Sequence, residues 1–244
     1  MSVRTTSAVA ARVLRQLRRD PRTVALLIVV PTVLVVLLHE VFSGREEVFQ
    51  RIGAPLLGIF PFISMFLVSS ITMLRERVSG TLERLMSMPL AKLDVLVGYA
   101  IAFAAVAAAQ ATIVSLVALG PLGLNVERPV TIVGLAIGNA VLGMSLGLFV
   151  SAFARTEFQA VQFMPAFVFP QLLLCGLLVP REQMAGWLDA VSWVLPLTYA
   201  YDALARAMAS APLGGRFWAD VAVVAGVTIA ALVLGAATLR RRTA

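Results

Sequence analysis

The chain is poor in the residues that usually carry catalysis, metal binding and solvent contact. Its 244 residues include one histidine, one cysteine and one lysine, and only 14% are charged. The lone His39 argues against a metal centre or a catalytic triad, because each needs partners that the chain does not supply. The lone Cys175 forms no internal disulfide. A soluble domain carries about 25% charged residues, so the composition excludes an ordinary soluble domain.

The shortage of lysine bears on whether this chain could bind ATP through a Walker A loop. A Walker A loop requires Gly-x-x-x-x-Gly-Lys followed by Ser or Thr. The only lysine, Lys92, lies in Leu-Ala-Lys-Leu, where no such loop exists. If ATP drives this protein, we expect another chain to bind it.

Apolar residues dominate what is present. They make up 60% of the chain, and the mean hydropathy is +0.92. About 20 apolar residues cross the hydrocarbon layer as a helix, and six runs reach that length. They are Thr23–Phe42, Ala54–Leu74, Val95–Leu119, Val130–Phe153, Gln159–Val179 and Phe217–Leu239. We therefore predict an all-α membrane protein, with residues 1–244 as a single transmembrane domain.

The basic residues predict its orientation. Fourteen of the 20 Lys and Arg fall in the N-terminal flank, the connections after the second and fourth runs, and the tail. The positive-inside rule then puts both termini in the cytoplasm. The net charge of +7 is thus explained by membrane orientation, without nucleic acid as a partner.

An amphipathic helix is expected before the first span, over residues 5–20, with a solvated basic flank that only sets the topology as the alternative. Two arcs separate on a helical wheel, which is typical of a helix lying in the membrane interface. The apolar arc holds Val9, Ala10, Val13, Leu14 and Leu17, and the basic arc holds Arg12, Arg15, Arg18, Arg19 and Arg22.

A charged segment, residues 75–89, connects the second and third spans. Ser79 is a candidate helix cap, and Pro89 would end the helix. Leu82, Leu85 and Met86 would form one apolar face. We therefore predict that this segment forms a short amphipathic helix at the cytoplasmic edge of the membrane. The alternative is a plain hairpin loop, which would not need such an apolar face.

Two other classes fit poorly. An ion-coupled secondary transporter usually keeps an acid or histidine deep in a span, and the interiors of these spans have almost none. Gly143-Met-Ser-Leu-Gly147 matches a hydrolase pattern, but that motif needs a strand–turn–helix elbow. Its glycines, with Gly134 and Gly138, instead predict close helix packing within the subunit, with a dimer seam as the alternative.

Two stretches carry a family resemblance. Arg75-Glu-Arg-Val-Ser-Gly-Thr-Leu-Glu-Arg-Leu-Met-Ser-Met-Pro89, with Gly98-Tyr99, resembles the motif after the second span of ABC-2 type transporter permeases. Cys175-Gly-Leu-Leu-Val-Pro180 and Leu195-Pro-Leu-Thr-Tyr-Ala-Tyr-Asp-Ala-Leu204 resemble that family's re-entrant segment between the last two spans, here residues 180–215.

The resemblance implies a permease subunit that works with a separate ATPase. ATP and magnesium would bind that partner, and no cofactor is expected in this chain. The helix after the second span would be a coupling helix, and a second permease subunit, identical or paralogous, would complete the pathway. The matching coupling positions are Arg75, Glu76, Gly80, Thr81, Glu83 and Arg84.

Residues for the pathway and an outer gate are hypotheses. Aromatic and amide side chains on the second and fifth spans would suit a lipophilic substrate, although a lipid-facing Phe stripe explains them equally well. The pathway set is Phe62, Phe66, Gln162, Phe163, Phe167 and Gln171. The gate set is Pro196, Tyr199, Asp202 and Arg206, where an interfacial aromatic belt is the alternative.

The sequence thus predicts the permease of a multidrug-type ABC exporter in a bacterial plasma membrane. Its substrate would be hydrophobic or amphipathic: a drug, an antibiotic or a lipid-like compound. A polysaccharide or glycolipid exporter is the alternative within the family.

Overall fold

The computed structural model describes residues 2–87, 92–209 and 211–238, which form helices and connections without a strand. A short 3-10 turn covers Arg181–Gln183. The α-helices are α1 (Val3–Arg18), α2 (Pro21–Val41), α3 (Glu46–Val78), α4 (Thr81–Ser87), α5 (Lys92–Leu119), α6 (Pro129–Val150), α7 (Glu157–Leu174), α8 (Gly186–Ser192), α9 (Pro196–Met208) and α10 (Gly215–Ala237).

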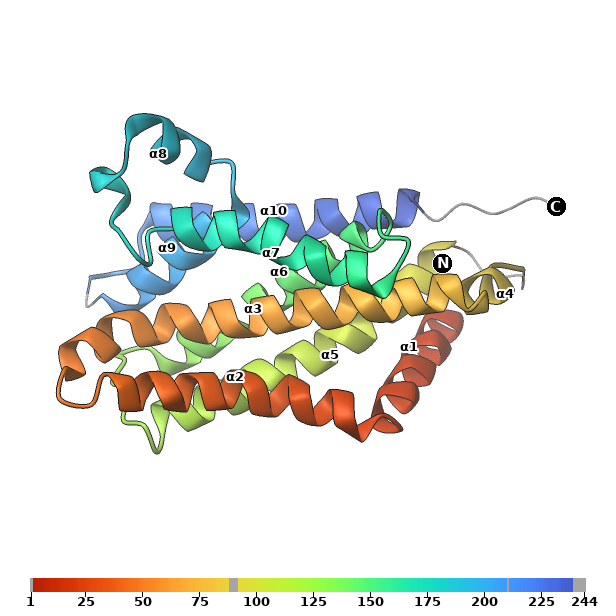
Figure 1. Ribbon diagram of the computed structural model, residues 1–244, viewed down its shortest axis with the longest axis horizontal. Coiled ribbons are helices and arrows are strands. Elements are labelled where there is room, and N and C mark those ends of the chain that lie inside the picture. The colour runs from red at the N-terminus through yellow and green to blue at the C-terminus, as the bar shows by residue number, and fades with distance from the viewer. Residues whose placement is uncertain (1, 88–91, 210, 239–244) are drawn as a thin grey trace.

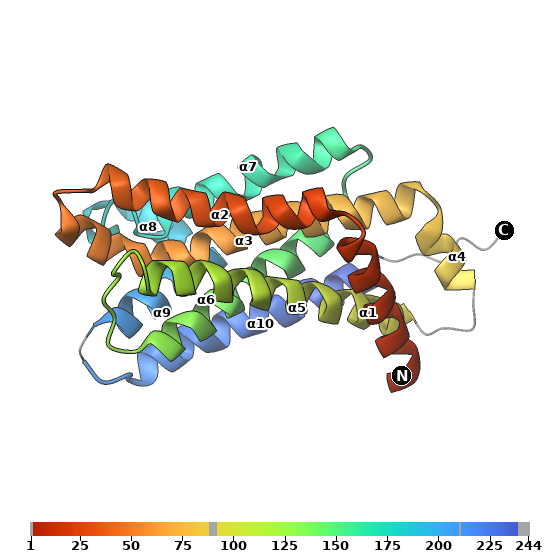
Figure 2. The same ribbon diagram turned by 90° about the horizontal axis from the view of Figure 1, so that it is seen from below.

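The long helices α2, α3, α5, α6, α7 and α10 run roughly along one axis (Figure 1). Helix α1 lies across one end of this bundle, where α4 and the end of α10 also lie (Figure 2). Helices α8 and α9 lie toward the opposite end. We refer to these as the α4 end and the α8 end.

Five helices in the described residues are long and apolar enough to cross a membrane: α2, α3, α5, α6 and α10. The all-α membrane fold is therefore confirmed. The fifth predicted span, Gln159–Val179, corresponds to α7, which has 18 residues and includes Glu157 and three glutamines. It ends at Leu174, before the predicted Val179, because Gly176 takes a left-handed φ of 101° directly after the cap. The six-span topology stays a prediction.

Helix α3 packs most closely against α6. A Cβ at Gly143 would lie 2.2 Å from the backbone oxygen of Phe62, and one at Gly147 would lie 2.3 Å from that of Phe66. These two glycines pack within the subunit, as predicted, because only a hydrogen fits there. The prediction is wrong for Gly134 and Gly138, where a Cβ would meet nothing within 4 Å.

Candidate functional site

Helix α1 is amphipathic and packs its apolar side on the bundle. Val9, Ala10, Val13 and Leu17 are buried. Leu14, assigned to the same arc, is instead 38% exposed. Arg12, assigned to the basic arc, turns inward. The predicted apolar and basic sides of α1 were therefore wrong at these two residues, because a helical wheel does not show which helices α1 packs against.

Arg12 connects α1 to two long helices. Its Nη2 lies 3.2 Å from Glu76 Oε2 on α3, and its Nη1 donates to Tyr99 Oη on α5 at 3.1 Å. The Glu76 side chain is 4% exposed. Burial disfavours the charge on Arg12, but the Tyr99 bond and the Glu76 charge outweigh it, so the pKa of Arg12 rises above its ordinary value. A buried carboxylate needs such a partner, so Glu76 holds α1 in place.

A second polar contact fixes the start of α1. Asp94, in the first turn of α5, accepts from Ser2 N at 3.2 Å and from Thr5 Oγ1 at 2.8 Å. Close backbone approach strengthens the join, since a Cβ on Gly98 would lie 2.7 Å from Val9 Cβ. Helix α1 is thus attached to α5 along its N-terminal half.

The short helix α4 begins after a sharp turn. Helix α3 continues to Val78, with Ser79 as its C-cap, and Gly80 has a φ of 69°. Ser79 therefore ends α3, which corrects its prediction as the N-cap of the next helix. The Ser79 hydroxyl hydrogen-bonds with the Thr81 hydroxyl at 2.9 Å. Because α3 continues to Val78, Arg75 and Glu76 belong to α3 and not to α4.

The apolar side of α4 rests on the bundle. Leu82 is 6% exposed, and Leu85 packs against the same buried cluster. Arg84 is exposed. Pro89 and the side chains of Glu83 and Met86 lie outside the part of the chain that the structure describes. Helices α1 and α4 and the adjoining ends of α3 and α5 form what we call the α4-end platform.

Arg75 links this platform to α7. Its Nε and Nη2 donate to the two carboxylate oxygens of Glu157, at 2.7 and 2.9 Å. The two side chains are 58% and 52% exposed, so solvent weakens the attraction. Of the six predicted coupling residues, Gly80, Thr81 and Arg84 lie at the turn and on α4. Glu76 is directed inward to Arg12.

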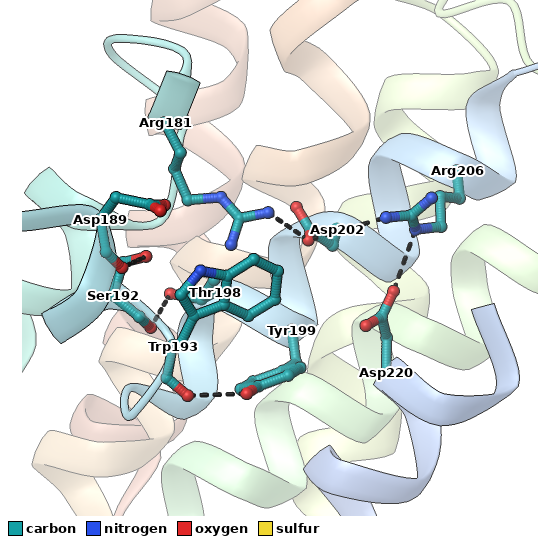
Figure 3. A network of polar contacts seen from close by, with 9 residues as sticks. All are labelled: Arg181, Asp189, Ser192, Trp193, Thr198, Tyr199, Asp202, Arg206 and Asp220. Atoms are coloured by element: carbon teal, nitrogen blue, oxygen red, sulfur yellow. Dashed lines mark hydrogen bonds and ion pairs between the residues drawn. The ribbon is translucent and has the colours of Figure 1, made fainter. Parts of the chain in front are cut away.

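The predicted gate residues meet a charged network at the α8 end (Figure 3). Asp202 pairs with Arg181, and Arg206 donates to Asp220 at 3.0 Å. Asp202 and Arg206, which are four residues apart on α9, form a longer pair at 3.9 Å. Burial raises the pKa of Asp202, and Arg181 opposes that rise. Arg181 and Asp220 were not predicted, because their partners lie far away in sequence.

Trp193 and Tyr199 close the same network. The guanidinium of Arg181 lies 4.4 Å from the Trp193 ring centroid, a cation–π geometry. Tyr199 donates to the backbone oxygen of Trp193 at 2.6 Å, and Pro196 is the first residue of α9. The contacts join the segment around α8 to α9 and α10.

The predicted pathway residues lie in different surroundings. Phe62 and Phe66 are fully buried, and Phe66 stacks on Phe167 with centroids 6.5 Å apart. Gln171 is buried and accepts from Leu197 N at 3.3 Å. Gln162 is exposed and Phe163 is half-buried. A cavity of about 580 Å³ lies instead between α2 and α3, and none of the six residues lines it. This groove could not be predicted from the sequence, because it depends on the spacing of two helices.

Comparison with known proteins gives one family and several relatives. The ABC-2 type transporter family model matches residues 4–209. "Probable multidrug ABC transporter permease YbhR" of Escherichia coli K12 is 31% identical over 150 residues, which is 60% of this chain and 40% of that protein. "ABC transporter G family member 20" of Dictyostelium discoideum is 28% identical over 166 residues, which is 67% of this chain and 23% of that protein. The chain thus spans less than half the length of these curated relatives.

Proposed function

The chain belongs to the ABC-2 type transporter family, and from this premise we propose that it is the permease subunit of an ATP-driven exporter of hydrophobic or amphipathic compounds. The family match and the long apolar helices indicate that the chain is a multi-pass membrane component of a transporter. The substrate, the outward direction and the bacterial plasma membrane belong to the proposal. So does a second permease subunit, identical or paralogous.

The α4-end platform is the observation that carries the proposal. Helix α1 is attached to α3 through Arg12–Glu76 and to α5 through Asp94. Helix α4 contacts both α3 and α5. A displacement of α4 would therefore be transmitted to α3 and α5 together, because packed helices move as rigid elements. This supports a coupling role for Arg75, Gly80, Thr81, Glu83 and Arg84, with Glu76 acting through α1.

This arrangement supports an ATPase on another chain. The chain has no Walker A loop, and the basic connections at the α4 end support placing that end in the cytoplasm. ATP and magnesium would bind the partner. The interiors of the predicted spans hold almost no charged residues, which favours a lipophilic cargo over a small ion.

A charge reversal on α4 tests the docking. The tagged chain would be purified from its native membranes, and any companion protein identified by its mass and by a Walker A sequence. We expect Glu83→Arg to lose that ATPase while membrane insertion is retained. Glu127→Arg, the same change at the exposed connection between α5 and α6, should keep it. Equal recovery of the ATPase with both variants would refute docking on α4.

A further inference from the structure

The groove between α2 and α3 has apolar walls and one polar end. Its walls include Val30 and Leu34 of α2 and Leu67 of α3. Polar side chains gather at the α4 end, where α1, α2 and α3 meet. They are Gln16, Asp20, Thr23, Thr72 and Arg75. One end of this groove therefore suits a polar group, and the rest suits a hydrocarbon chain.

The deep part of the groove offers an occupant few polar groups to pair with. Ser64 is the polar side chain there, and its hydroxyl already accepts from Gln110 and donates to the Phe60 carbonyl. The groove wall from Thr23 to Leu34 on α2 is about 17 Å long at 1.5 Å per residue. That is close to one leaflet, about half of the ~30 Å hydrocarbon layer. The volume of about 580 Å³ is in the range of small-molecule sites.

The polar end carries one acid and one base. Asp20 accepts from Thr23 N at 3.2 Å and from Thr23 Oγ1 at 2.6 Å, and these bonds hold the pKa of Asp20 below its usual range. The charges of Arg75 and Arg22 also favour the ionised form. Arg75 donates to Glu157 through its Nε and Nη2, which leaves Nη1 to bind an additional anion.

We propose that the α2–α3 groove binds a zwitterionic amphiphile of the phospholipid class. One hydrocarbon chain lies along α2 and α3, the phosphate lies at Arg75, and the amine lies at Asp20. The compound enters sideways from the leaflet at the α4 end. As a substrate assignment this rests on the proposed function, whereas binding itself requires neither ATP nor a partner and is tested alone.

The experiment titrates the purified, delipidated full chain with phosphatidylethanolamine and counts bound lipid by native mass spectrometry. Val30→Trp and Leu67→Trp fill the groove from its two walls and should each weaken binding by at least roughly tenfold, about 1.4 kcal/mol. Val233→Trp is the control, since Val233 is exposed on α10 and does not line the groove. Equal binding by all three variants and the parent would overturn the site.

The head group is tested with two further probes. Phosphatidylglycerol lacks the amine and hexadecyltrimethylammonium lacks the phosphate, so both should bind more weakly than phosphatidylethanolamine. Asp20→Asn keeps an N-cap residue and should weaken phosphatidylethanolamine but not phosphatidylglycerol. Equal affinity for all three probes would refute the zwitterionic assignment. Loss of dimerisation in Val30→Trp with lipid binding unchanged would identify a second copy of the chain as the occupant, and would also refute it.

Discussion

Arg12 is the residue through which α1 reaches the long helices. Replacing it by alanine leaves the Glu76 carboxylate, which is 4% exposed, without its ion-pair partner. Breaking a fully buried pair costs about 3–5 kcal/mol. Because the Arg12 side chain is 33% exposed, we expect Arg12→Ala to lower the free energy of unfolding by a smaller amount, about 1–3 kcal/mol.

Denaturation of the purified chain in mixed detergent micelles measures this loss. Arg18→Ala, on the exposed side of α1, should change the midpoint little. The double variant Arg12→Ala with Glu76→Gln should recover part of the loss, since no charge is then stranded. A double variant whose loss equals the sum of the two single losses would show that the pair does not interact.

The α6 glycines provide a matched pair at the same scale. Gly143→Ala places a Cβ 2.2 Å from the Phe62 oxygen, so α3 and α6 must separate. Gly138→Ala meets nothing within 4 Å and gains up to about 1 kcal/mol in helix propensity. In the same denaturation assay we expect Gly143→Ala to lower the midpoint and Gly138→Ala to keep or raise it. A similar drop in both would contradict the open space beside Gly138.

At the scale of elements, the turn between α3 and α4 depends on Gly80. Its φ of 69° is left-handed, which costs another residue about 1–2 kcal/mol. Gly80→Ala should therefore tilt or fray α4 and reduce the amount of ATPase that co-purifies. Gly44→Ala is the control, because Gly44 has a φ of 87° in the turn between α2 and α3. It should lose similar stability but keep the ATPase.

The elements were predicted better than their contacts. Each long helix follows from an apolar run, and α4 follows from the alternation of charged and apolar residues at Thr81–Ser87. The end of α3 was missed, because Ser79 suits a helix start by composition but lies four residues after Arg75, whose carbonyl its N–H reaches. The pairing of Glu76 with Arg12 and that of Asp202 with Arg181 were missed as well, since helix packing brings these residues together.

At the scale of the whole molecule, the topology depends on whether α7 crosses the membrane. The α6–α7 connection, which contains Arg155, lies toward the α4 end (Figure 1), and Glu182 follows the other end of α7; both residues are exposed. If α7 spans, these two positions face opposite sides. If it does not span, they face the same side, which would contradict the position of the α4 and α8 ends at opposite ends of the bundle.

Single cysteines in a Cys175→Ser background decide between these arrangements. A maleimide that cannot cross membranes should label Glu182→Cys in intact cells and Arg155→Cys only after the membrane is opened. Glu127→Cys should match Glu182→Cys, because both would lie outside. Six spans bring the basic residues at both chain ends to one side, which is why the charge bias favours this pattern. Labelling of Arg155→Cys in intact cells would mean that α7 is not a span, and the six-span topology would be wrong.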